Sequence, residues 1–172
     1  MRTTLVLVLL TLSAAHPAVA GAATTTPWTH TRPLTPGAAT LLADATTRSS
    51  IVKTLLQDLE RTDVVVYLSD SMTGWAGEPR AYLSFVSSTA STRYLVVRID
   101  RWRLAPLERI AWLGHELQHA MEVAAAPDVK NASGLTRLYR RIGWEDRKGR
   151  FESERAQAIG HRVRDQLSGF EK

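Results

Sequence analysis

The sequence predicts a small α+β domain, in which a short and mostly antiparallel sheet packs against helices. Three observations favour this class. Apolar residues recur at helical spacing in several stretches. Three short segments are rich in β-branched residues and are bounded by polar residues, glycine or proline. The order of these patterns, a helical region, three strands and then further helices, is typical of an α+β domain.

The first 99 residues are expected to hold a helical region and all three strands. Residues 38–60 have apolar residues at helical spacing and form either one bent helix or two. Gly74, Gly77 and Pro79 make residues 70–80 a loop. The three predicted strands, of which the last two form a β-hairpin, are residues 63–69, 81–86 and 92–99.

The longest predicted helix follows the strands. Pro106 suits a first helical turn, and Pro127 ends the helix near residue 125. His115 and His119 lie opposite an apolar stripe, so we expect one face to pack on the core and the other to present the histidines from a cleft wall. The stripe consists of Leu107, Ile110, Leu113, Leu117, Met121 and Ala124.

Two more helices are expected after this one. Leu135, Leu138 and Ile142 mark a helix that ends near Gly143. A charged loop then precedes a last helix that begins near Phe151.

The first residues have the pattern of a secretory signal peptide. Met1 and Arg2 precede a short apolar run, and Ala18-Val19-Ala20 forms a cleavage site of the A-x-A type. The run is too short to span a membrane. The predicted division is a signal peptide over residues 1–20, a flexible lead-in over 21–37 and one domain over 38–172.

The chain of 172 residues contains no cysteine. This composition excludes a thiolate nucleophile and any metal site with cysteine ligands. Together with the signal peptide, it is typical of a bacterial protein that is secreted or periplasmic and folds without disulfides.

The net charge of +5 is concentrated after Lys130. A basic face could attract acidic peptides, envelope polyanions or nucleic acid. No aromatic-interleaved or groove-reading motif accompanies it, so we interpret it as the solvated side of helices and expect no nucleic-acid partner.

The sequence His115-Glu116-Leu117-Gln118-His119 is an HExxH pattern. Residues four apart lie on the same face of a helix, so both imidazoles can bind one ion. Zinc accepts histidine nitrogens and in catalytic sites keeps one position for water. The carboxylate of Glu116 lies at the flank, where it can act as general base. We therefore expect one Zn²⁺ on His115 and His119.

A third ligand should come from an acidic residue downstream. Glu122 lies too far along the helix to share the ion, and is expected either to orient a ligand or to be solvated. On a wheel of the last helix, Glu152 falls in the middle of the apolar face, where a carboxylate is costly unless it is paired or metal-bound. Glu152 is therefore the predicted ligand, with Glu154 or a water as alternatives; Glu145 is the remaining candidate.

These residues resemble the zincin metallopeptidases. His-Glu-Leu-Gln-His with a glutamate downstream in Phe-Glu-Ser-Glu-Arg-Ala is similar to the gluzincin arrangement, and residues 92–167 resemble small secreted bacterial zincin-like proteins. The metzincin pattern does not fit, because Glu122 and Ala125 stand where it needs glycine and histidine. The resemblance implies that residues 92–99 form an edge strand that pairs with an extended peptide.

The expected activity is hydrolysis of peptide bonds in a peptide or protein substrate. Glu116 would take a proton from the attacking water and pass it to the leaving amine. Tyr139, His161 and Arg141 are candidates for stabilising the transition state. The alternatives are a binding module of the bacterial envelope that keeps this scaffold without turnover, and a protein that binds polyanions through its basic face.

Overall fold

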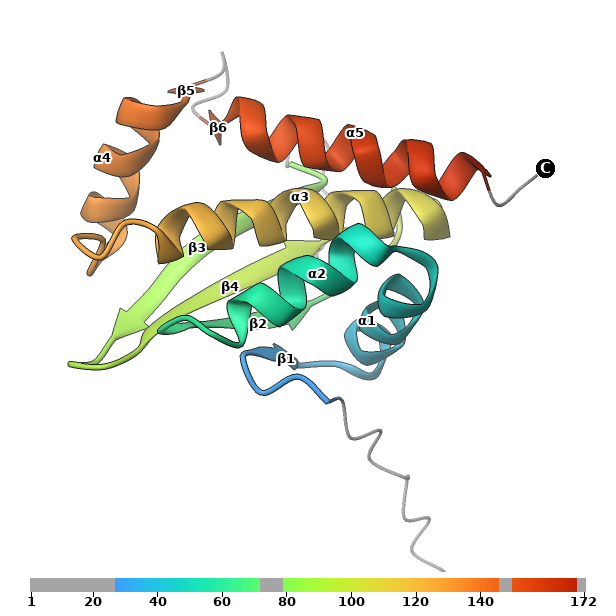
Figure 1. Ribbon diagram of the computed structural model, residues 1–172, viewed down its shortest axis with the longest axis horizontal. Coiled ribbons are helices and arrows are strands. Elements are labelled where there is room, and N and C mark those ends of the chain that lie inside the picture. Colours follow the sequence, from blue (N-terminus) through green and yellow to red (C-terminus); the bar gives the residue numbers. More distant parts are fainter. Residues whose placement is uncertain (1–26, 72–78, 146–149, 170–172) are drawn as a thin grey trace, which may run out of the picture.

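The computed structural model describes residues 27–71, 79–145 and 150–169, so the predicted signal peptide lies outside the described residues. The α+β class is confirmed: a small mixed sheet has helices packed on it (Figure 1). The strands are β1 (Thr31–Pro33), β2 (Val64–Ser69), β3 (Ala81–Ser88), β4 (Arg93–Ile99), β5 (Trp144–Glu145) and β6 (Phe151–Glu152). The helices are α1 (Pro36–Arg48), α2 (Ser50–Leu59), α3 (Pro106–Ala124), α4 (Ala132–Ile142) and α5 (Glu154–Ser168).

The main sheet has the strand order β1-β2-β4-β3. The predicted hairpin between β3 and β4 is confirmed. However, β2 pairs in parallel with both of its neighbours, β4 and β1. The prediction of a mostly antiparallel sheet is therefore wrong. The strand that follows β2 in the sequence, β3, lies at the edge of the sheet and not beside β2. The hairpin then brings β4 into the position between β2 and β3. As a consequence, β3 is an edge strand, with β1 at the other edge, and the expectation that residues 92–99 form an edge is wrong.

The predicted lead-in is wrong for its last residues. Residues 31–33 form β1, which pairs in register with residues 66–68, and Thr31 is buried. The hydroxyl of Thr35 then accepts a hydrogen bond from the Ala38 N–H and begins α1. Backbone pairing with β2 thus orders residues 31–33, although their amino-acid composition predicted a flexible segment.

The helical region before the sheet divides into α1 and α2 at Ser49. The buried Ser49 hydroxyl accepts a hydrogen bond from the Val52 N–H, which begins α2. It also donates to Gln166 Oε1 at 2.8 Å, which joins this corner to α5. An N-cap residue inside a helical pattern favours two helices over one bent helix.

Helix α3 lies between the sheet on one side and α5 on the other (Figure 1). Its apolar stripe, including Leu113 and Leu117, packs in the core with one face of the sheet. The opposite face was expected to present the histidines from a cleft wall, and His119 and His115 do line cavities. Helix α5 covers part of this face, and His115 and His119 are only 6% and 4% exposed. Gly114 allows the two helices to approach, because a Cβ there would stand 2.9 Å from Cγ2 of Val163 on α5.

A buried arginine joins the sheet to the end of α3. Arg93 at the start of β4 forms an ion pair with Asp63 at 2.5 Å. Its guanidinium also donates to the carbonyl oxygens of Val123, Ala124 and Ala126, which lie at and just beyond the end of the helix. This contact sets where α3 ends relative to the sheet.

The segment between α4 and α5 is more ordered than the predicted charged loop. Residues 144–145 and 151–152 pair as the antiparallel strands β5 and β6; residues 146–149 lie outside the described part of the chain. The Ser153 hydroxyl accepts from the Ala156 N–H, so α5 begins at Glu154 rather than near Phe151. Among the residues that the structure describes, no helix has the length and apolar character needed to cross a bilayer.

Candidate metal centre

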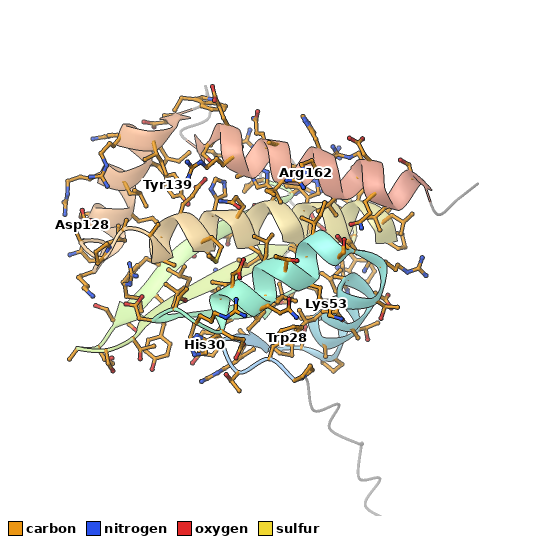
Figure 2. All side chains as sticks on the ribbon, in the orientation of Figure 1. Trp28, His30, Lys53, Asp128, Tyr139 and Arg162 are labelled. Carbon is orange, nitrogen blue, oxygen red and sulfur yellow. The ribbon has the colours of Figure 1, made fainter. Side chains whose placement is uncertain are left out.

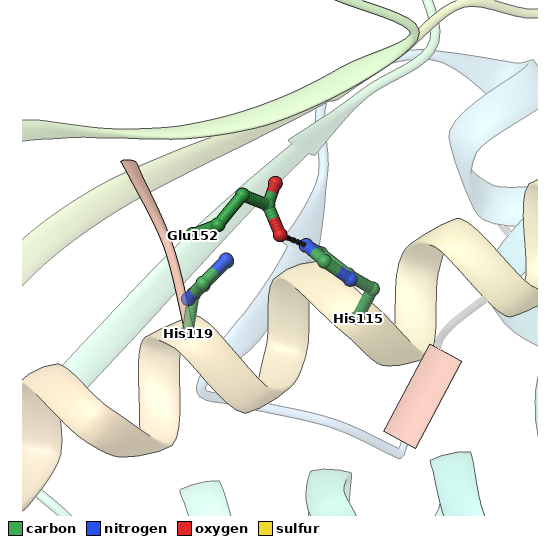
Figure 3. Close-up of side chains that lie close together, drawn as sticks. All are labelled: His115, His119 and Glu152. Atoms are coloured by element: carbon green, nitrogen blue, oxygen red, sulfur yellow. Dashed lines mark ion pairs between the residues drawn. The ribbon is translucent and has the colours of Figure 1, made fainter. Parts of the chain in front are cut away.

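Three potential metal ligands from two parts of the chain meet beside α3. His115 and His119 project from α3, and Glu152 reaches them from β6 (Figure 3). His115 Nε2 lies 3.5 Å from Glu152 Oε2, and one ligand atom of each residue lies within 4.8 Å of the others. Ligands held at about 2.1 Å from one tetrahedral ion would be roughly 3.4 Å apart. The His115–Glu152 pair already has this separation, and the other pairs need to close by at most about 1.4 Å.

A buried chain of hydrogen bonds orients His119. Its Nδ1 lies 2.9 Å from Glu122 Oε2, and the other carboxylate oxygen of Glu122 accepts from the Ser153 hydroxyl at 2.6 Å. An ionised carboxylate only accepts, so Nδ1 of His119 carries the proton and Nε2 is left to bind a cation. Of the two interpretations of Glu122, the solvated one is wrong: the residue is 6% exposed and orients a potential ligand.

Burial and neighbouring charges shift the pKa values of one histidine and two glutamates in this cluster. Burial alone would lower the pKa of His115, but Glu152, Glu116 and Glu122 hold it above its usual value. Burial also opposes ionisation of Glu152, yet His115 and His119 bring its pKa below the usual value. For Glu116, burial prevails over the two histidines and raises the pKa. A carboxylate that binds a proton more readily than an ordinary glutamate suits a general base.

Two cavities adjoin the three ligands. The first, about 430 Å³, is lined by Glu116, His119 and Glu152 together with the edge strand β3. The second, about 370 Å³, is lined by His115, Glu152 and the first turns of α5. Trp112 and Arg150 line both, as does Glu152, so the candidate metal centre lies where the two cavities adjoin.

The three candidates for transition-state stabilisation lie in different places. Tyr139 is buried against His119, with ring centroids 5.0 Å apart, and lines the first cavity (Figure 2). Its hydroxyl donates weakly to the His119 carbonyl oxygen at 3.4 Å, and burial raises its pKa well above the usual value. His161 lines the second cavity. Arg141 lines neither, and lies 3.9 Å from Asp128.

The structure brings Glu152 to the histidines by a different route from the predicted one. Glu152 belongs to β6 and not to the apolar face of α5, so the helical wheel that selected it does not apply. Glu154 and Glu145 are exposed and do not belong to the cluster. Sequence reasoning missed the role of Ser153, although serine before a helix is a common N-cap. It also missed Trp112, Arg80 and Arg150, which no motif marks.

Comparisons of the chain with known protein families, with curated proteins and with solved structures found no match. The function is therefore argued from the chemistry of the donor set and from its surroundings. Two imidazoles and one carboxylate, oriented by a buried hydrogen-bond chain, form a ligand set that suits Zn²⁺.

Proposed function

We propose that this protein is an exported zinc-dependent metallopeptidase, with His115, His119 and Glu152 as ligands and Glu116 as general base. The observation that supports this most directly is the position of Glu116. Its carboxylate lines the same cavity as His119 and Glu152 and is nearly fully buried. A proton acceptor beside a set of three ligands is the arrangement that hydrolysis by an activated water requires.

A Zn²⁺ ion bound here would supply a Lewis acid that polarises a carbonyl group and lowers the pKa of a water. The protein contributes the proton transfers. Glu116 takes a proton from the attacking water and then gives it to the leaving amine. Glu122 and Ser153 hold His119 in one orientation throughout.

The substrate in this proposal is an extended peptide that pairs with β3. Residues 81–83 of this edge strand line the first cavity together with Glu116. Within the described residues, β3 pairs only with β4 in the main sheet, which leaves its outer edge for a peptide strand. Tyr139, which lines the same cavity, is the best placed donor to a developing oxyanion.

The first experiment is to measure metal content and hydrolysis in four proteins. These are the wild type and the variants Glu152→Ala, Glu154→Ala and Glu116→Gln. We expect one zinc per chain, lost in Glu152→Ala and kept in the other two variants. Peptide hydrolysis should fall by at least about a thousandfold in Glu116→Gln, because a general base and its proton transfers are lost. Bound zinc without any hydrolysis would favour a binding module, and no zinc after reconstitution would refute the metal site.

A further inference from the structure

The second cavity is lined by basic and aromatic side chains. Arg164 and His161 reach it from α5, and Arg150 from the residues before β6. Trp112 and Trp144 form part of its wall, and Trp144 is 41% exposed although it is large and apolar. An exposed tryptophan at the mouth of a cavity is a common feature of a binding site.

Among the described residues that line this cavity, basic side chains outnumber acidic ones. Glu152 is the one acidic side chain among them, and its carboxylate faces His115. In the described part of the chain, no carboxylate lies within ion-pair distance of Arg164. An arginine with an open guanidinium beside aromatic rings is suited to bind a carboxylate with two parallel hydrogen bonds.

The second cavity adjoins the candidate metal centre on the side away from β3. Trp112, Arg150 and Glu152 line both cavities, whereas His115 lines only the second and Glu116 only the first. A peptide that pairs with β3 and presents a carbonyl to Glu116 would extend past Glu152 into this basic cavity. The group of the substrate that lies beyond the cleaved bond therefore meets Arg164.

We propose that the second cavity binds a carboxylate of the substrate, so that the protein selects acidic peptides. The carboxylate belongs either to an aspartate or glutamate side chain or to a free C-terminus. This inference rests on the proposed peptidase function, since it assigns the cavity to the substrate of that site.

The test measures peptide binding to the zinc-reconstituted Glu116→Gln protein, so that no turnover is required. The probes are N-acetylated, C-amidated octapeptide pools with Glu, Gln or Lys at one fixed position, and the Gln pool with a free C-terminus. Tryptophan fluorescence or calorimetry reports the Kd. We expect the Glu pool, the free C-terminus, or both to bind roughly tenfold more tightly than the amidated Gln pool, as for a hydrogen bond between charged groups. Which of these two binds tightly identifies the source of the carboxylate.

Two variants on α5 provide the comparison. Arg164→Gln should weaken binding of the Glu pool and of the pool with a free C-terminus to the level of the amidated Gln pool. Arg164→Glu should make the Lys pool bind most tightly. Arg162→Gln is the matched control, because Arg162 is exposed on the same helix but lines neither cavity (Figure 2). Equal Kd values for all pools, or equal effects of Arg162→Gln and Arg164→Gln, would overturn the proposal.

Hydrolysis by the wild type separates the two proposals. If the Gln and Glu pools are cleaved equally well, the peptidase function stands and the carboxylate site is refuted. If carboxylate peptides bind through Arg164 but no pool is cleaved, the carboxylate site stands and the peptidase function is refuted.

Discussion

Glu122 lies one helical turn beyond His119 on α3, and its carboxylate contacts the Nδ1 of that histidine at 2.9 Å. The contact determines which ring nitrogen is available to a cation. Glu122 is itself held by Ser153, the residue next to Glu152 in the sequence. The hydrogen-bond chain therefore runs from His119 on α3 to the residue that follows Glu152 of β6.

Replacing Glu122 should weaken metal binding without unfolding the protein. Glu122→Gln keeps the shape of the side chain but loses the charged acceptor, so His119 is held less firmly. We expect the Kd for zinc, measured by competition with a chelator, to rise about 10- to 100-fold. Glu154→Gln, at an exposed position on α5, is the control and should leave the Kd unchanged. An unchanged Kd in Glu122→Gln would show that the contact does not orient His119.

Gly143 is predicted to be required for the position of Glu152. A Cβ at this position would stand 1.9 Å from the Glu152 carbonyl oxygen, so Gly143→Ala must displace the backbone of β6. We expect zinc affinity to fall about tenfold or more, with the helical circular dichroism preserved. Gly169→Ala is the control, because nothing lies within 4 Å of a Cβ there. Wild-type zinc affinity in Gly143→Ala would mean that Glu152 is not a ligand or that β6 adapts freely.

Local patterns in the sequence were enough to find the elements that carry the site. The strands over residues 64–69 and 93–99 and the helix over 106–124 lie close to their predicted bounds, because their periodicity and their proline signals are local. The spacing of His115 and His119 also fixes their common face, whatever the rest of the fold does. These features need no knowledge of distant contacts.

The remaining features depend on contacts between distant segments. The parallel pairing of β2 with β4 depends on the position of β3 at the edge of the sheet, and no residue pattern within β2 or β4 predicts it. The burial of Glu122 depends on Ser153, which lies 31 residues away in the sequence. Glu152 was selected on a helical wheel, although the N-cap at Ser153 excludes it from the helix.

Arg93 is predicted to be the most important polar residue for stability. Arg93→Met leaves Asp63 without its partner and removes the guanidinium donors to three carbonyl oxygens at the end of α3. We expect the free energy of unfolding to fall by about 2–4 kcal/mol. Chemical denaturation measures this loss. Arg61→Met removes an exposed ion pair with Asp58 and should cost less than about 1 kcal/mol. Similar losses in both variants would contradict the structural role of Arg93.

Asp100 should make the fold sensitive to acid. Burial opposes its ionisation, but Arg103 and the N–H groups of Trp102 and Arg103 prevail and lower its pKa below the usual 3.8. Because the folded-state pKa is the lower one, ionised Asp100 stabilises the fold above pH 3.8, and this contribution is lost as the pH falls below that value towards the folded-state pKa. Asp100→Asn should therefore be less stable at neutral pH and lose less stability on acidification, measured by denaturation at several pH values. The exposed Asp44→Asn is the control, and an equally steep loss in Asp100→Asn and wild type would refute the assignment.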